Sequence, residues 1–224
     1  MRCKRLNQSG FTLVEIAIVL VIIGLLLGGV LKGQEMITNA KIKSVVNDMN
    51  GISAAHNSYL DRYKTLPGDE TAAAYTARGW GATIPAGNAN GSLGILVGAT
   101  FTNPAVGEGA GYWQSLRAAQ MIGGALTSAA LPTNAASGLV GINGAVTYGN
   151  NAPTVCVSGI PPKIALGVDI TVDGPLPATG IGNNVGVLRG AANAAAPLAP
   201  AAAAPGAAAY NETAATFWTL CRPI

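Results

Sequence analysis

Charged and aromatic side chains are scarce in this 224-residue sequence. Only 10% of the residues are charged, 5% are aromatic, and the chain has one histidine, His56. No Ser-His-Asp or Cys-His arrangement with a credible context accompanies it, so the sequence offers no residues for hydrolytic catalysis. We therefore expect a protein that is not an enzyme and that holds no cofactor. His56 is interpreted as a residue at the boundary of an apolar helix face, not as a catalytic base.

Basic residues gather at one place, the first ten residues. Arg2, Lys4 and Arg5 supply three of the thirteen Lys and Arg residues, and residues 1–10 contain no acid. The rest of the chain has ten basic and ten acidic side chains, with no further cluster of Lys or Arg. Strong electrostatic capture of nucleic acid needs such a cluster. Nucleic acid is therefore not indicated as a partner.

One long apolar run, residues 11–31, follows the basic leader. As a helix, its roughly 20 residues are enough to cross a ~30 Å hydrocarbon core. The positive-inside rule places residues 1–10 in the cytoplasm and the bulk of the chain outside. An ordinary secretory signal ends in an A-x-A junction after its apolar stretch, and none follows here. The small-residue junction instead precedes the run, in NQSG-FTLVE.

The apolar run contains one carboxylate, Glu15. A carboxylate inside a bilayer costs on the order of 3 kcal/mol on insertion scales, so it needs a partner other than lipid. A free amine at Phe11, four residues earlier, would lie within reach of Glu15 in the same helix. The Phe11 amine of a neighbouring helix is the alternative partner.

The stretch KRLNQSGFTLVEIAIVLVIIGLLL resembles the class III leader and N-terminal helix of type IV prepilins and pseudopilins. The resemblance implies that a membrane-embedded peptidase cuts between Gly10 and Phe11 and methylates the new amino group of Phe11. It also places Glu15 at the family's acidic position, where the carboxylate pairs with the Phe11 amine of a neighbouring subunit. A misplaced subunit would leave a buried charge without its partner, so this pairing would set the register of assembly.

The helix is expected to continue beyond the membrane to residue 64. Apolar side chains recur at spacings of three, four or seven residues, which is typical of a half-buried helix. They are Ile42, Val45, Met49, Ile52, Tyr59 and Tyr63. The stretch KTLPGDE ends the helix, because Pro67 disfavours the helical conformation at Leu66. Asp69 is then expected to cap a short helix beginning at ETAAAY.

Residues 65–224 are expected to form a globular head. The stretch YWQSLRAAQMIGG predicts a short helix over residues 112–124 that buries Trp113, Leu116, Met121 and Ile122. Three β-like runs, GLVGINGAVTYG, PTVCVSG and KIALGVDITVDG, predict an antiparallel meander. In the third run Val168, Ile170 and Val172 alternate as in a strand, although its resemblance to larger minor-pilin-like heads leaves a helix over 163–173 open. The Ala/Pro-rich stretch 190–212 is expected to be a surface loop.

Cysteine usage points to an oxidising compartment. Removal of residues 1–10 would take away Cys3 and leave Cys156 and Cys221, an even number. A bridge between them would contribute roughly 4 kcal/mol in the chain-entropy model. Two unrelated buried thiols are the alternative. The acids Asp169 and Asp173 match no defined calcium loop, so we expect ordinary turn chemistry there and no metal.

The sequence therefore predicts an α+β protein in three parts. These are a leader over residues 1–10, a helix over 11–64 whose first part (11–31) is the membrane and assembly segment, and a head over 65–224. The resemblance implies a structural subunit of a type IV pilus-like filament, held in the bacterial inner membrane before assembly. Its partners would be the prepilin peptidase and methyltransferase and other pilin subunits.

Three alternatives stay open at this point. The first is a minor pilin whose head acts at the tip in adhesion or DNA uptake. The second is a pseudopilin of a type II secretion system, and the third is an uncut single-pass anchor.

Overall fold

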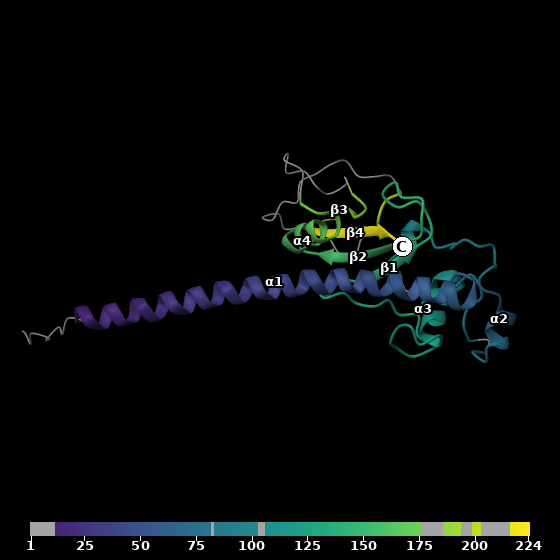
Figure 1. The fold of residues 1–224 in the computed structure, drawn as a ribbon, viewed down its shortest axis with the longest axis horizontal. Coiled ribbons are helices and arrows are strands. Elements are labelled where there is room, and N and C mark those ends of the chain that lie inside the picture. The colour runs from purple at the N-terminus through teal and green to yellow at the C-terminus, as the bar shows by residue number, and fades with distance from the viewer. Residues whose placement is uncertain (1–11, 82, 103–105, 176–185, 194–198, 203–215) are drawn as a thin grey trace, which may run out of the picture. The chain divides into compact units, whose positions relative to one another are not determined.

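The computed structural model describes residues 12–81, 83–102, 106–175, 186–193, 199–202 and 216–224. The chain divides into two compact units, Met1–Ala40 and Lys41–Ile224, and one long helix contributes to both. The elements are α1 (Leu13–Tyr63), α2 (Ala72–Ala77), the 3-10 turn η1 (Val97–Ala99), α3 (Gly107–Ala118), β1 (Val140–Asn143), β2 (Thr154–Ile160), α4 (Pro162–Asp173), β3 (Arg189–Asn193) and β4 (Phe217–Pro223). A long apolar helix followed by a globular part with an antiparallel sheet confirms the α+β class (Figure 1).

The outer part of α1 forms one side of the hydrophobic core of the head. Its predicted apolar stripe is confirmed, because Val45, Met49, Ile52 and Tyr59 are buried. The helix ends after Tyr63, where Lys64 takes a left-handed conformation with φ +58°. His56 is only 4% exposed, so the expectation of a boundary position for this residue was wrong.

The four strands form one antiparallel sheet in the order β1-β2-β4-β3 (Figure 1). β1 and β2 form a hairpin, but the chain then passes through α4 to the edge strand β3 and returns as β4 between β3 and β2. The predicted meander was therefore wrong in its connectivity. The central strand β2 is buried along its whole length, which explains why its sequence is a near-continuous apolar and small-residue run.

The run KIALGVDITVDG forms helix α4, so its interpretation as a strand was wrong. Pro162 lies in the first turn, where the missing N–H of proline costs no helical hydrogen bond. The buried positions Ile164, Ala165 and Val168 follow the period of a helix and not of a strand. α4 also packs closely on α1, because the Ile42 side chain fills the space where a Cβ on Gly167 would stand.

Helix α3 begins and ends earlier than the sequence indicated. It spans Gly107–Ala118, and Trp113 and Leu116 are buried as expected. Met121 and Ile122 lie beyond the helix and are only half-buried. The apolar spacing continued past residue 118, but the backbone stopped being helical there.

The turn after α1 differs from the prediction in its capping residue. Thr71, not Asp69, caps α2, with its hydroxyl accepting from the backbone N–H of Ala74 at 3.3 Å. The Asp69 carboxylate instead accepts from the backbone N–H groups of Asn90 and Gly91, at 3.2 and 2.7 Å. Asp69 therefore holds the Gly/Asn-rich loop against the end of α1.

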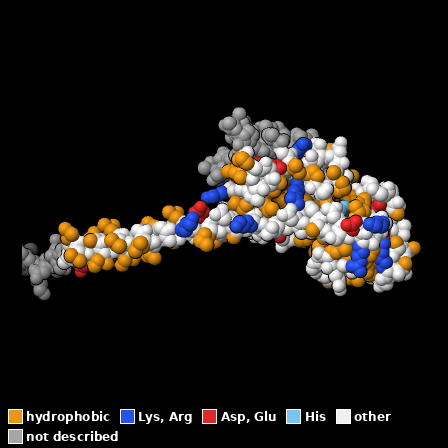
Figure 2. All heavy atoms as spheres, viewed as in Figure 1, with side chains coloured by type: hydrophobic (Ala, Val, Ile, Leu, Met, Phe, Trp, Pro, Cys, Tyr) orange, Lys and Arg blue, Asp and Glu red, His pale blue; other side chains and the backbone are white. Residues whose placement is uncertain are grey.

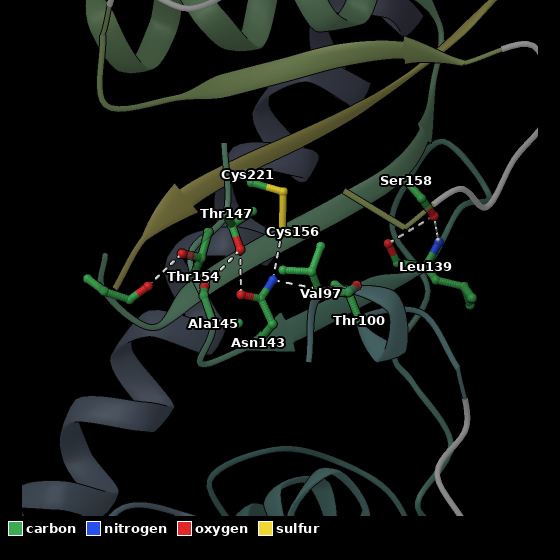
Figure 3. The surroundings of a disulfide bond; sticks show 11 residues. Val97, Thr100, Leu139, Asn143, Ala145, Thr147, Thr154, Cys156, Ser158 and Cys221 are labelled. Carbon is green, nitrogen blue, oxygen red and sulfur yellow. Dashed lines mark hydrogen bonds between the residues drawn. A yellow bond between two sulfur atoms is a disulfide. The ribbon is translucent and has the colours of Figure 1, made fainter. Parts of the chain in front are cut away.

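A disulfide joins the two central strands. Cys156 on β2 and Cys221 on β4 are directly opposite each other in the ladder and are bonded, so the predicted bridge is present. Both cysteines are fully buried. Figure 3 shows Asn143 of β1 beside the bridge, with its amide nitrogen 3.8 Å from Cys156 Sγ and 3.2 Å from the hydroxyl of Thr100. The bridge therefore belongs to the hydrophobic core and has one polar neighbour, the amide of Asn143.

Candidate assembly segment

The first part of α1 is a helix whose apolar side chains are exposed on every side. An 18-residue window of this helix has a mean hydropathy of 2.8 and no buried residues. Figure 2 shows these hydrophobic side chains along the helix. Exposed apolar surface of this extent is not stable in water and marks a membrane or protein contact. By length and composition, α1 is the one helix among the described residues that could cross a membrane.

Glu15 and Thr12 form a reciprocal cap at the start of this helix. The backbone N–H and the hydroxyl of Thr12 both donate to Oε2 of Glu15, at 2.9 and 2.8 Å. The backbone N–H of Glu15 donates in return to the hydroxyl of Thr12 at 3.3 Å. This is the capping box, in which Thr and Glu three residues apart satisfy donors that the first helical turn leaves free. The carboxylate therefore has a partner within its own chain.

The pattern T-x-x-E at residues 12–15 could have revealed this cap, but the sequence analysis considered only the amine of Phe11 as a partner. Gly10 and Phe11, the predicted cleavage and methylation positions, lie outside the described residues. At the other end of the apolar run, Lys32 donates to Glu35 at 2.7 Å. The run is therefore bounded by charged side chains on both sides.

Residues 5–31 match the family model of the prokaryotic N-terminal methylation motif. The chain carries the class III signal of type IV prepilins and pseudopilins. This signal supports a type IV pilin-like or pseudopilin protein and implies processing by prepilin peptidase and assembly with other pilins. No curated protein and no solved structure gave a significant match to the chain. The match begins at residue 5 and covers the apolar part of α1, and it does not extend to the head.

The apolar helix is consistent with membrane anchoring, and the motif is that of pilin-type structural proteins. Among the described residues, no group of three or more His, Cys, Asp or Glu side chains is placed to hold a metal ion.

The head contains a partly buried ion pair that the sequence did not predict. Glu70, 2% exposed, is paired with Arg78 and accepts hydrogen bonds from the hydroxyls of Tyr59 and Thr65, each at 2.7 Å. Arg78 also lies over the ring of Tyr63, 4.3 Å from its centroid. These contacts join the end of α1 to α2. Because both oxygens of the Glu70 carboxylate are bonded to side chains of the head, we interpret this cluster as a structural contact and not as a catalytic base.

The environment of the buried tyrosines agrees with this structural role. Burial, together with the hydrogen bond to Glu70, raises the pKa of Tyr59. Burial and the charge of Glu70 raise the pKa of Tyr75 to about 12. Both phenols therefore stay neutral at physiological pH.

His56 lies against Tyr112 of α3, with its Nδ1 atom 3.4 Å from the tyrosine hydroxyl. Burial lowers the pKa of the His56 imidazole.

Proposed function

We propose that this chain is a structural subunit of a type IV pilus-like filament. It is made as a prepilin, cut between Gly10 and Phe11, methylated on the Phe11 amine, and assembled through the first part of α1. The observation that carries this proposal is the apolar helix exposed on all sides, in a chain that bears the methylation motif. A helix of this kind needs apolar surroundings both before and after assembly.

Apolar burial alone does not make such a helix leave the bilayer. Lipid tails are as apolar as leucine, so moving residues 13–31 from lipid into a bundle of helices gains little hydrophobic free energy. Close packing and polar pairing between helices must then supply the free energy of assembly and set the register of the subunits. Glu15 is the only ionisable side chain between residues 12 and 31. Register in the filament therefore depends on this carboxylate.

The capping box leaves Glu15 able to take a second partner. Both donors from Thr12 reach Oε2, and an ionised carboxylate accepts about four hydrogen bonds over its two oxygens. Cleavage after Gly10 creates a positive amine at Phe11, four residues before Glu15 in the sequence. Oε1 of one subunit then pairs with the Phe11 amine of its neighbour. A subunit out of register loses this charge pair in an apolar environment, which is strongly unfavourable.

Shearing of surface filaments tests the proposal. The tagged chain is expressed in piliated cells and in matched cells that lack prepilin peptidase, and the sheared and membrane fractions are compared. The proposal predicts the chain in the sheared fraction only when the peptidase is present. Retention in the membrane of peptidase-positive cells that shed other pilins would contradict it. The ratio to the major pilin in the sheared fraction separates a major from a minor subunit.

A further inference from the structure

The head has an open cleft of about 580 Å³ between Trp80 and the segment that follows α3. Its lining includes Trp80, Arg117, Gln120, Ile122 and Leu126, with the backbone of Gly123 and Gly124 between them. The volume falls in the range of small-molecule sites. Polar and apolar groups both contribute to its walls, and no carboxylate is among the lining residues.

Several hydrogen-bonding groups in the cleft lack a protein partner among the described residues. Trp80 forms a hydrogen bond through its backbone N–H, but its indole N–H has none, and the side-chain amide of Gln120 has none either. Arg117 donates to the carbonyl oxygens of Gly123, Ser128 and Ala130. A guanidinium has five N–H donors, so two remain. The Trp80 ring also stacks on Tyr75 at 6.1 Å and lies 5.3 Å from the guanidinium of Arg78, so only part of the half-buried indole lines the cleft, beside these donors and one amide oxygen.

Gln120 adopts a conformation that glycine would adopt at lower cost. Its φ is +60°, and it occupies the position after the C-cap of α3. Its N–H donates to the carbonyl of Arg117 and the N–H of Met121 donates to that of Leu116, each at 3.0 Å. This is the Schellman arrangement, where glycine is favoured because it has no Cβ. Glycine would be less strained at this position, so the Gln120 side chain is kept beside the cleft at a conformational cost.

We propose that this cleft binds a pyranose saccharide. The C–H face of the sugar packs on the part of the Trp80 indole that lines the cleft, and its hydroxyls bond to the indole N–H, the Gln120 amide and the free N–H groups of Arg117. A mainly apolar ligand would leave these donors desolvated and unsatisfied. A nucleotide phosphate fits the cleft less well, because Arg117, the one cation in the lining, already donates to three carbonyl oxygens. The site lies on the head and is independent of the assembly role of α1.

Binding is tested with the full-length chain in a detergent that has no sugar headgroup. An array of neutral, N-acetylated and uronic-acid mono- to tetrasaccharides is probed, and each hit is titrated while the indole N–H resonance of Trp80 is followed by NMR. The proposal predicts at least one saccharide that shifts the Trp80 resonance in a saturable manner. Tighter binding of a uronic acid than of its neutral analogue would place Arg117 in contact. Equal binding would leave Trp80 and Gln120 as the contacts. No binding across the array, or hits that leave the Trp80 resonance unmoved, would overturn the proposal.

Two glycine variants separate binding from folding. Gln120→Gly removes the amide and relieves the left-handed strain, so it should weaken saccharide binding at least about fivefold while raising the melting temperature by about 2 °C. Ser137→Gly is the matched control, because Ser137 is exposed, has φ +68° and lies outside the cleft lining. It should raise the melting temperature similarly and leave binding unchanged. Wild-type affinity in Gln120→Gly would overturn the assignment of Gln120, and wild-type affinity in Trp80→Leu, which removes both the ring and the indole N–H, would overturn the saccharide site itself.

Discussion

The carboxylate of Glu15 accepts hydrogen bonds from both the backbone N–H and the hydroxyl of Thr12, one helical turn before it. An acid in an apolar segment is therefore already partnered within its own chain. This arrangement lowers the cost of holding Glu15 in a membrane, because the carboxylate is not stripped of all its donors. It also separates two roles of one residue, since the cap needs an acceptor oxygen and the proposed contact between subunits needs a negative charge.

Two variants of the capping pair distinguish these roles. Glu15→Gln keeps an acceptor for the cap, because glutamine serves in the capping box, but removes the charge. It should abolish incorporation into filaments when wild-type subunits compete. Thr12→Ala removes the cap at a cost of about 1 kcal/mol but leaves the charge, so incorporation should stay near normal. Quantitative blotting of sheared filaments measures both, and efficient incorporation of Glu15→Gln would contradict the charge-pairing account.

The disulfide between Cys156 and Cys221 is expected to be a large part of the stability of the head. The two cysteines are 65 residues apart, and closing a loop of that length contributes about 4 kcal/mol in the chain-entropy model. The double variant Cys156→Ala with Cys221→Ala should lose about this amount in urea unfolding of the detergent-solubilised chain.

Burial of the same bridge predicts its resistance to reduction. Because both cysteines are fully buried, dithiothreitol should reduce them only when denaturant is added. Thiol labelling followed by mass spectrometry measures this, in a Cys3→Ser background so that every labelled thiol comes from the bridge. Rapid labelling under native conditions would show that the sheet opens around the bridge.

The buried pair of Glu70 and Arg78 should be far more important for stability than an exposed pair. Glu70→Ala leaves Arg78 and the hydroxyl of Tyr59 without their acceptor, and we expect a loss of about 3 kcal/mol. Asp61→Ala is the control, since it removes an exposed contact with Lys64 and should change stability by less than about 0.5 kcal/mol. Thermal unfolding followed by circular dichroism compares them. Equal effects would show that Glu70 is solvated in solution.

His56 should make the head less stable in mild acid. Burial lowers the pKa of its imidazole below the usual value, so between the folded and unfolded pKa values the unfolded chain binds more protons. Stability is therefore full above about pH 6.5, falls as the pH drops below it, and levels off beneath the folded pKa. His56→Gln should flatten this dependence between pH 7.5 and 5.5. Melting temperatures across that range measure the difference, and parallel curves for both proteins would contradict it.

The sequence was sufficient for the features that are local or strongly periodic. The apolar run, the α1 stripe from Val45 to Tyr59 and the end of the helix before Pro67 all follow from spacing and from the backbone chemistry of proline. The pairing of Cys156 with Cys221 followed from counting cysteines. These features require no knowledge of distant neighbours.

The errors arose where packing between distant segments decides the structure. The run from Pro162 to Asp173 has a strand-like alternation at its end, but α4 is helical because it packs Ile164 and Val168 into the core and accommodates Ile42 at Gly167. The sequence placed His56 at the boundary of the apolar face, but in the structure it is buried and contacts Tyr112 of α3. Glu70 and Arg78 meet through the turn after α1, and no short motif indicates that contact.

Mass spectrometry of the chain from sheared filaments, without reduction, tests the central claim most directly. The account predicts a protein that begins at Phe11, carries one methyl group on its amino terminus, and is two hydrogen atoms lighter through the bridge between Cys156 and Cys221. A protein that still begins at Met1, in cells that process their other prepilins, would contradict it.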